Sequence, residues 1–400
     1  MAATGGMTAA ATAPDNTWVA VAPVPARLDA PVFALAVDPA QSQTVLIGTS
    51  TGSIFRSVDG GAYWREVAAG LGRGVLSIAF NPLRPGTVLA GGRAAGIWRS
   101  TDSGATWTHL SSAPETSARA FAFGRTMSVA GTDRGVLINT TGDNWVPAGL
   151  AQVGVAAVAM AAVNDPTRIF AGGDATSGDE TLPLYQSTDG GKTWPIVKGP
   201  LSSSTMVAAL AAGPLPPRSD TRPLLLGTNV GAFLTTDNGA SWSALAGLPA
   251  TDFNAVAFVR DHPERFYLAS DGGDTDNGGV WVTSDGGRSF RTLNPPLPAV
   301  TAIAVTYEDT PTVYAAAFRA SDHAAMIWSI KDAGGPAVPP AGGVPAPAAA
   351  ESHASAPSSP IGNPLRALAV GPEAPYLAVG LISLWVLFLA LTSYVRRGRA

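Results

Sequence analysis

The chain has 400 residues, of which 46% are hydrophobic and 14% charged, and it contains 45 glycines and 33 prolines. This combination of many turn-forming residues with few charges suits an all-β repeat protein. The formal net charge of −4 gives no basis for nucleic-acid binding, which requires a basic surface. Because the chain has no cysteine, disulfides and thiolate metal sites are excluded.

The N-terminal segment, residues 1–14, consists mostly of small residues and is predicted to be flexible. It lacks the charged n-region and the apolar h-region by which a signal peptide is identified. Residues 16–21 (NTWVAV) look like the end of a turn motif that recurs later in the chain, followed by a strand. The first half of that motif is missing at this point.

The segments that follow alternate between strand and turn patterns. Residues 32–39 alternate like a strand that ends at Asp-Pro, and residues 44–49, 54–57 and 64–67 are predicted as three further strands. The same order recurs at residues 75–82, 87–92, 96–100 and 107–110, and later first strands are expected at 120–123, 155–163, 206–212, 254–259 and 301–306. Four strands in each unit of roughly 40 to 50 residues indicate a propeller blade.

A turn motif follows the third strand of most units. Each copy has a Ser or Thr, an Asp two residues later, a Gly two residues after that, and a closing aromatic residue. The Gly supplies the positive φ that a tight turn requires, and the Asp can accept hydrogen bonds from its own turn. The aromatic ring offers a large apolar face to a neighbouring sheet. Five full copies span residues 57–64, 100–107, 187–194, 235–242 and 283–290, and a copy that is one residue shorter spans 139–145.

These copies resemble the Asp-box (BNR) repeat of sialidases, sortilin-like receptors and photosystem assembly propellers. The resemblance implies a β-propeller, whereas function does not follow from the fold. In that family the Asp-box is a folding device that lies away from the ligand face. The resemblance therefore implies a structural role for Asp59, Trp64, Asp102, Trp107, Asp189, Trp194, Asp237, Trp242, Asp285 and Phe290.

The first strands number seven, which predicts a seven-bladed propeller of four-stranded blades over residues 15–332. The last unit has three strands and ends in Asp332-Ala333-Gly334, which is the front half of a turn motif. The orphan half-motif at residues 16–21 supplies the missing strand. We therefore expect the N-terminal strand to close the ring, since closure removes exposed sheet edges.

The C-terminal region has a different composition. Residues 333–375 are mainly Pro, Ala, Gly and Ser, which predicts an extended linker. Tyr376 and Val395 bound 20 uncharged residues, enough for a transmembrane helix, and residues 396–400 form a basic tail. Arg396, Arg397 and Arg399 favour a cytoplasmic C-terminus and an extracytoplasmic propeller in the cell envelope. Tail-anchored insertion with the propeller in the cytosol is the alternative, which the lack of a signal peptide favours.

The ligand face of a propeller is formed by the loops from second to third strands and from one blade to the next. Two of these loops, residues 172–181 and 271–278, are long and acidic. Clustered carboxylates with glycines are typical ligands of hard cations. A calcium ion in the loop from Asp271 to Asp276 is one interpretation; two solvated polar loops are the other, because the spacing matches no strict calcium loop. The candidate ligand-face residues are Arg73, Arg93, Asp133, Arg134, Asp174, Asp179, Glu180, Asp271, Asp274, Asp276 and Arg319.

Two classes of function are compatible with these features. The first is a bacterial, single-pass, membrane-anchored scaffold, receptor or assembly factor that binds a protein or a glycan and has no catalytic residue or cofactor. The alternative is an exo-acting glycoside hydrolase, either sialidase-like or with two Asp residues about 5 to 9 Å apart. No sialidase residue is assigned, because the blade count differs, Glu is scarce, and Glu66, Glu264 and Glu308 lie on the wrong face. Carboxylates clustered at the channel mouth would favour the enzyme.

Overall fold

The computed structural model describes residues 15–26, 28–141, 143–161, 167–173, 184–197, 199, 201, 205–273 and 278–336. The chain divides into two units, Met1–Val344 and Pro345–Ala400, and all described residues belong to the first. The expected membrane span bounded by Tyr376 and Val395, most of the linker and the basic tail lie outside the described residues. Within the described ranges, no helix has the length and apolar character to cross a membrane.

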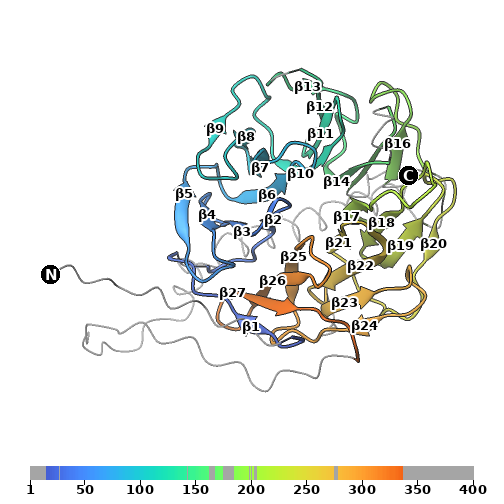
Figure 1. The fold of residues 1–400 in the computed structure, drawn as a ribbon. Coiled ribbons are helices and arrows are strands. Elements are labelled where there is room, and N and C mark those ends of the chain that lie inside the picture. The colour runs from blue at the N-terminus through green and yellow to red at the C-terminus, as the bar shows by residue number, and fades with distance from the viewer. Residues whose placement is uncertain are drawn as a thin grey trace, which may run out of the picture. The chain divides into compact units, whose positions relative to one another are not determined.

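Seven antiparallel sheets surround a central axis, which confirms the predicted seven-bladed propeller (Figure 1). In blades 1 to 6 the first strand lies nearest the axis, and the later strands follow outward in chain order. Blade 1 contains β2 (Ala34–Asp38), β3 (Gln41–Gly48), β4 (Ile54–Ser57) and β5 (Arg65–Ala68); blade 2 contains β6 (Val75–Phe80), β7 (Val88–Gly92), β8 (Ile97–Ser100) and β9 (Thr108–His109); blade 3 contains β10 (Ala118–Phe123), β11 (Ser128–Thr132), β12 (Gly135–Asn139) and β13 (Val146–Pro147).

The next three blades repeat this order with short outer strands. In blade 4, among the described residues, a single bridge between Tyr185 and Ile196 takes the place of the fourth strand. Blade 4 contains β14 (Val155–Met160), β15 (Ile169–Gly173) and β16 (Leu184–Ser187); blade 5 contains β17 (Val207–Ala212), β18 (Leu224–Thr228), β19 (Gly231–Thr235) and β20 (Ser243–Ala244); blade 6 contains β21 (Ala255–Val259), β22 (His262–Ser270), β23 (Gly279–Thr283) and β24 (Arg291–Thr292).

Blade 7 is assembled from both ends of the propeller sequence. Its strands β25 (Val300–Val305), β26 (Thr312–Arg319) and β27 (Ala324–Lys331) are completed by β1 (Val19–Ala20), which pairs with β27. The backbone N–H of Asn16 donates to the carbonyl of Lys331 at 2.8 Å, which extends the contact beyond the strand. The predicted closure of the ring by the N-terminal strand is confirmed, so β27 is not left as an unpaired edge.

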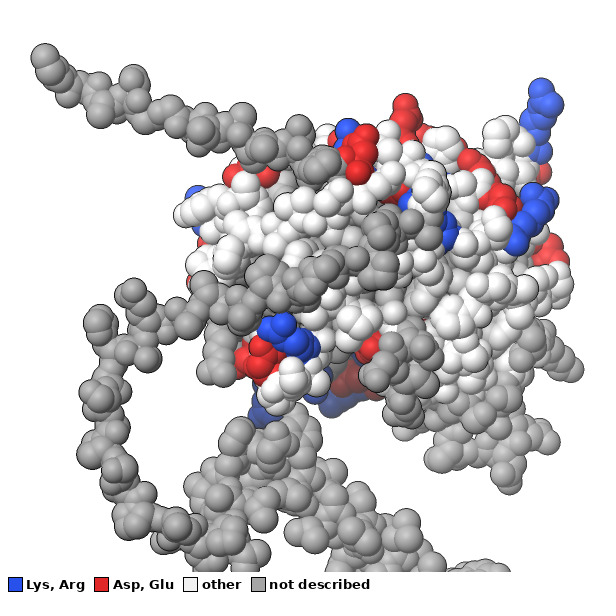
Figure 2. Space-filling model, turned by 90° about the horizontal axis from the view of Figure 1, so that it is seen from below, with Lys and Arg blue, Asp and Glu red and all other residues white. Residues whose placement is uncertain are grey.

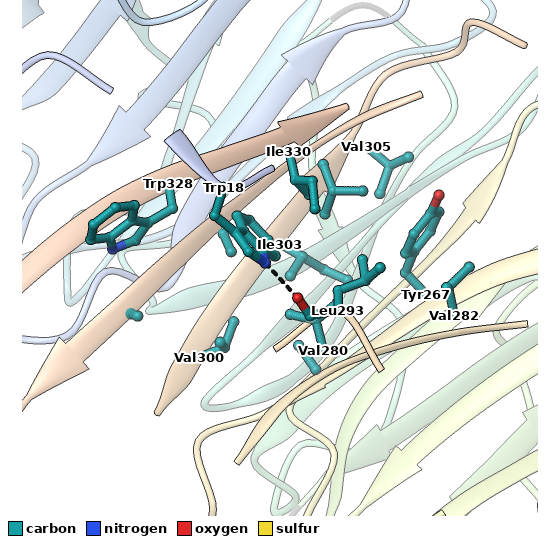
Figure 3. Close-up of a cluster of buried hydrophobic side chains, with 14 of the residues drawn as sticks. Trp18, Tyr267, Val280, Val282, Leu293, Val300, Ile303, Val305, Trp328 and Ile330 are labelled. Carbon is teal, nitrogen blue, oxygen red and sulfur yellow. Dashed lines mark hydrogen bonds between the residues drawn. The ribbon is translucent and has the colours of Figure 1, made fainter. Parts of the chain in front are cut away.

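Seven hydrophobic clusters lie at the junctions between neighbouring blades. Glycines at the ends of second strands allow the next blade to approach, since a Cβ added at Gly172 would lie 2.4 Å from a methyl group of Val207. Each cluster also contains the aromatic residue that closes the turn motif of the later blade. Between blades 6 and 7 this residue is Trp18, whose indole N–H donates to the carbonyl of Leu293 at 2.6 Å (Figure 3).

The turns between third and fourth strands, here called box turns, are stabilised from within. In blade 4 the Ser187 hydroxyl donates to Asp189 Oδ1 at 2.8 Å, and the same carboxylate accepts from the backbone and hydroxyl of Thr193 at 2.9 and 2.6 Å. Blades 2, 5 and 6 have the same bonds. Hydrogen bonds from Ser241 similarly lower the pKa of Asp237 to about 2. The Asp residues therefore fix the turns, as the motif predicted.

The aromatic residues of the box turns differ in burial. Trp64 and Trp145 are 2% and 3% exposed, whereas Trp107, Trp194, Trp242 and Phe290 are only half-buried. We expected Trp194 to be a core residue, and this is only partly correct. Its indole N–H donates to the carbonyl of Ala148 at 2.5 Å, so part of the ring packs on the blade junction while the rest remains accessible.

The seventh box turn is divided between the two ends of the propeller. Asp332 occupies the Asp position, but Ile330 stands where the five full-length box turns have Ser or Thr, so the internal hydroxyl bond cannot form. The fully buried Asp332 carboxylate instead pairs with Arg265 at 2.9 Å and with Arg291, both from blade 6. Blade 7 is thus attached to blade 6 by a buried ion-pair network.

Candidate site on the rim face

The loops between second and third strands and those between blades share one face of the propeller, here called the rim face. The interblade residue Leu71 donates its N–H to the carbonyl of Gly52 in the β3–β4 loop at 2.9 Å. On the other side, the box turn residue Gly60 donates to the carbonyl of Gln43 in the β2–β3 hairpin at 2.9 Å. Box turns and first hairpins therefore form the opposite face, here called the box face.

Four of the predicted ligand-face residues are neighbours on the rim of blades 1 to 3. The backbone N–H of Arg73 donates to the carbonyl of Arg93 at 3.2 Å. One blade further, the Asp133 carboxylate accepts from the backbone N–H of Ser117 at 2.8 Å, and the Ser117 hydroxyl accepts from the N–H of Ala94 at 3.1 Å. These hydrogen bonds link the loop that holds Arg93 to Asp133 through Ser117. Three exposed guanidinium groups lie along this line of loops. We call Arg73, Arg93 and Arg134 the arginine arc.

Arg319 lies apart from this arc, on the rim of blade 7. Its guanidinium group donates to both oxygens of Asp322 at 2.9 and 2.7 Å, which closes the β26–β27 loop. The hydrogen bond to Asp322 raises the pKa of Arg319, and the same contact lowers the pKa of Asp322. This pair is therefore a loop clasp at the surface, and its charges are already matched.

Asp271, on the rim of blade 6, forms a carboxyl pair with Asp252. Burial raises the pKa of Asp271, and the hydrogen bond and negative charge of Asp252 raise it further, against the N–H of Gly273. Asp252 in turn accepts from the Ser270 hydroxyl at 2.9 Å. The Asn254 amide lies beside Asp271 and slightly opposes the rise, yet neither of its polar atoms makes a hydrogen bond of normal geometry.

The mouth of the central channel lies between the arginine arc and the carboxyl pair. It is a cavity of about 210 Å³ lined by the rim ends of first strands, which contribute seven alanines. Arg119 and Asn254 are polar residues of this lining, and Phe33, 53% exposed, stands at its edge. The alanines keep the mouth open because larger side chains at the axis would fill it.

Asp174, Asp179, Glu180, Asp274 and Asp276 lie outside the described residues. Where the chain is described, no three His, Asp or Glu side chains are grouped so that they could hold a metal ion. The side of the propeller in Figure 2 is largely uncharged, with acidic and basic residues in small groups.

Sequence reasoning did not single out Asp252, Arg119 or Phe33. All three lie where an interblade segment enters a first strand, which is a position that the propeller pattern assigns to the rim face. Their place in this pattern could have identified Asp252 as a rim residue. Its pairing with Asp271 depends on how closely two loops of one blade approach, and no spacing in the sequence encodes this distance.

Comparison with known proteins supports the fold. No family model and no curated protein matches the chain. The WD40 propeller domain of Doa1 is similar with a TM-score of 0.59 and 11% identity, over 79% of this chain and 98% of that one. A structure described as YCF48 bound to D1 peptide is similar with a TM-score of 0.55 and 17% identity, over 79% of this chain and 97% of that one.

Glycosidases of the GH74 group also match, over a smaller part of their length. An ancestral GH74 enzyme has 15% identity and a TM-score of 0.41, over 75% of this chain, and this chain spans 36% of that enzyme. At these identities the Doa1 and YCF48 structures show the propeller fold alone, and the activity has to be argued from the site.

Proposed function

We propose that the chain is a propeller of the Asp-box type whose rim face binds a peptide segment of a protein partner without catalysing a reaction. The observation that carries this proposal is the division of charge around the channel mouth. The arginine arc lies on blades 1 to 3 and the carboxyl pair on blade 6, across the axis (Figure 1). A peptide laid over the mouth would place acidic groups on the arc and a basic group on the pair.

The apolar part of the mouth supports the same proposal. Phe33 exposes about half of its surface at the edge of an alanine-lined depression. Exposed aromatic residues near the centre of a binding surface commonly contribute most of the binding free energy. Phe33 is therefore proposed as the anchor and the surrounding charges as the determinants of orientation.

A peptide ligand is also the ligand described for one structural neighbour. The YCF48 structure carries a D1 peptide, and its likeness to this chain covers nearly its whole length. This supports a peptide in preference to a glycan as the class of ligand, while the identity of the partner depends on residues specific to this chain.

The carboxyl pair does not favour the glycoside hydrolase alternative. Two carboxyl groups of a glycosidase stand about 5 to 9.5 Å apart, because a sugar or a water must fit between them. Asp252 and Asp271 instead lie close enough for Asp252 to raise the pKa of Asp271. Such mutual influence is typical of two carboxyl groups that share a proton. A glycosidase instead has an acid and a nucleophile on opposite sides of the scissile bond.

Affinity capture from the host's solubilised envelope, quantified by mass spectrometry, tests the proposal. The bait is the full chain, compared with a variant in which Arg73, Arg93 and Arg134 are replaced by Ser. The control variant carries Arg65→Ser and Arg288→Ser, two exposed arginines away from the rim. We expect at least one protein to be captured by the wild type and the control and lost from the rim variant. Capture profiles that do not depend on the rim arginines would contradict the proposal.

We further propose that residues 376–395 anchor the chain in a membrane with the propeller on the extracytoplasmic side. This rests on the uncharged run and the following arginines, Arg396, Arg397 and Arg399. Protease added to sealed cells stripped of wall and any outer membrane should release the propeller by cutting between residues 336 and 363. Protection until lysis would show the cytosolic orientation and would move the partner to the cytoplasm.

A further inference from the structure

Two exposed apolar side chains lie together on the rim face of blade 5. Met206 precedes β17 and is 46% exposed, and Val230 lies in the β18–β19 loop and is 54% exposed. Asn229 joins their two segments: its side-chain oxygen accepts from the N–H of Met206 at 2.7 Å, and its N–H donates to the carbonyl of Met206 at 3.2 Å. We call Met206 and Val230 the apolar pair.

Blade 3 joins the corresponding two segments in the same way. The Asp133 carboxylate accepts from the N–H of Ser117 at 2.8 Å, and the N–H of Asp133 donates to the carbonyl of Ser117 at 3.2 Å. Met206 thus occupies in blade 5 the position that Ser117 occupies in blade 3. The Ser117 side chain is buried and bonded within the loops, whereas the Met206 side chain is exposed to solvent.

The loops between second and third strands also match at their tips. The N–H of Arg134 donates to the Thr132 hydroxyl at 3.0 Å, and the N–H of Val230 donates to the Thr228 hydroxyl at 3.2 Å. Val230 is therefore the counterpart in blade 5 of Arg134, a member of the arginine arc. Because these hydrogen bonds are the same, the two loops differ in the side chain that they expose: a guanidinium group on blade 3 and an isopropyl group on blade 5.

The carboxyl pair lies beside the apolar pair, on the next blade. The N–H of Phe253 donates to the carbonyl of Thr228 at 2.8 Å. Phe253 directly follows Asp252, and Thr228 ends β18 at the start of the loop that carries Val230, so this bond brings the two segments together. The described rim residues of blades 3, 5 and 6 therefore present basic, apolar and acidic side chains, in that order around the channel mouth (Figure 1).

This order of side chains specifies the chemistry of the ligand. Burial of the apolar pair is favourable only against an apolar group, and the unbranched Met206 side chain can adapt its shape to one. The flanking charges favour a peptide over a lipid surface, because an anionic bilayer would face the carboxyl pair with charge of the same sign. A peptide with its acidic residues on the arginine arc and its basic residue on the carboxyl pair would place an intervening apolar residue over blade 5.

We propose that the partner peptide carries an aliphatic residue that packs on Met206 and Val230, beside its basic residue and on the side of its acidic residues. This inference rests on the proposed function and adds to it the class of peptide that the rim selects. Met206 and Val230 are then specificity-determining residues, since the equivalent positions of blade 3 carry polar side chains in the same loop geometry.

Selection of phage-displayed random peptides on the detergent-solubilised full-length chain tests this inference. The test variant carries Met206→Ser and Val230→Thr. The matched control carries Leu215→Ser, at a residue that is 46% exposed in the β17–β18 hairpin on the box face of the same blade. A third bait has the arginine arc replaced by Ser. We expect the wild type and the control to enrich peptides with an aliphatic residue beside a basic one. The test variant should enrich peptides with the same charges and no aliphatic preference.

Fluorescence anisotropy with one enriched peptide, made synthetically, provides a second readout. The Kd should be about tenfold higher for the test variant than for the wild type. Replacement of the aliphatic residue of the peptide by Ala should weaken wild-type binding by a similar factor and leave binding to the test variant unchanged, because both changes remove one contact.

An aliphatic preference that persists in the test variant, or effects of the two changes that simply multiply, would overturn this inference and leave the peptide-binding rim standing. Enrichment of the same peptides by the bait without the arginine arc would instead contradict the proposed function. Failure of the wild type to enrich any peptide would overturn both.

Discussion

Val19 lies directly opposite Ser329 in antiparallel pairing, although nearly the whole propeller sequence separates them. Deletion of residues 1–22 should therefore lower the melting temperature and promote self-association. It removes Trp18 from the junction of blades 6 and 7 and exposes the edge of β27. Loss of a buried Trp typically costs about 3 to 5 kcal/mol. Deletion of residues 1–14 is the control, and calorimetry with light scattering is the measurement. A monomeric 1–22 deletion with an unchanged melting temperature would falsify the closure.

Asp332→Asn should destabilise the propeller by about 3 to 5 kcal/mol, because it leaves two largely buried arginines without their carboxylate. Despite burial, hydrogen bonds from Tyr267 and Arg265 lower the pKa of Asp332. The wild type should therefore lose this stabilisation as the pH falls below about 4 and through the lowered pKa, whereas the variant should not. Asp322→Asn, at an exposed ion pair, should change little. Denaturant unfolding at several pH values measures the free energy of unfolding of both variants. Equal losses of stability in Asp332→Asn and Asp322→Asn would refute the network.

Trp64→Ala should cost more stability than Trp194→Ala, although both residues close the same motif. Trp64 is 2% exposed and donates to the carbonyl of Ala22 at 3.0 Å, so we expect about 3 to 5 kcal/mol for its removal. Removal of the half-buried Trp194 side chain should cost less stability. Urea unfolding of the two variants provides the comparison. A larger loss at Trp194 would mean that burial does not determine the contribution of these residues.

Asp271→Asn should stabilise the protein at neutral pH. Burial and the neighbouring Asp252 raise the pKa of Asp271, so the folded state binds its proton more tightly than the unfolded state does. For such a group, stability declines as the pH rises from about 3.9 through the raised pKa. The variant should lack this decline in melting temperature between mildly acidic and neutral pH. Asp261→Asn, at an exposed residue, is the control. An unchanged profile in Asp271→Asn would contradict the carboxyl pair.

The repeated motif predicted the fold because its spacing reports a unit that packs only against its neighbours. The half-motifs at Asn16 and Asp332 likewise predicted closure, since each lacks what the other supplies. The partners of Asp332 could not be predicted in this way: Ile330 removes the internal hydroxyl donor, and only the approach of blade 6 brings Arg265 within reach.

For the candidate site, the sequence placed residues on the rim without showing which of them meet. Arg73 and Arg93 come from different loops and become neighbours only through the junction of blades 1 and 2. A cation beside Asp271 was one of two interpretations of its loop, of which residues 274–277 lie outside the described ranges. The described carboxyl neighbour of Asp271 is Asp252. Such contacts depend on loop conformation at distances of a few ångströms, which strand periodicity does not encode.

The central claim, a peptide-binding rim, is tested most directly by photo-cross-linking from the proposed anchor. A benzophenone amino acid replaces Phe33 in the full-length chain expressed in its host, and the same replacement is made at Tyr63, which is 70% exposed on the box face. After irradiation, mass spectrometry maps the cross-linked peptides. We expect position 33 to yield one dominant partner segment that carries both acidic and basic residues, and position 63 not to yield it. The same products from both positions, or none from position 33, would contradict the account.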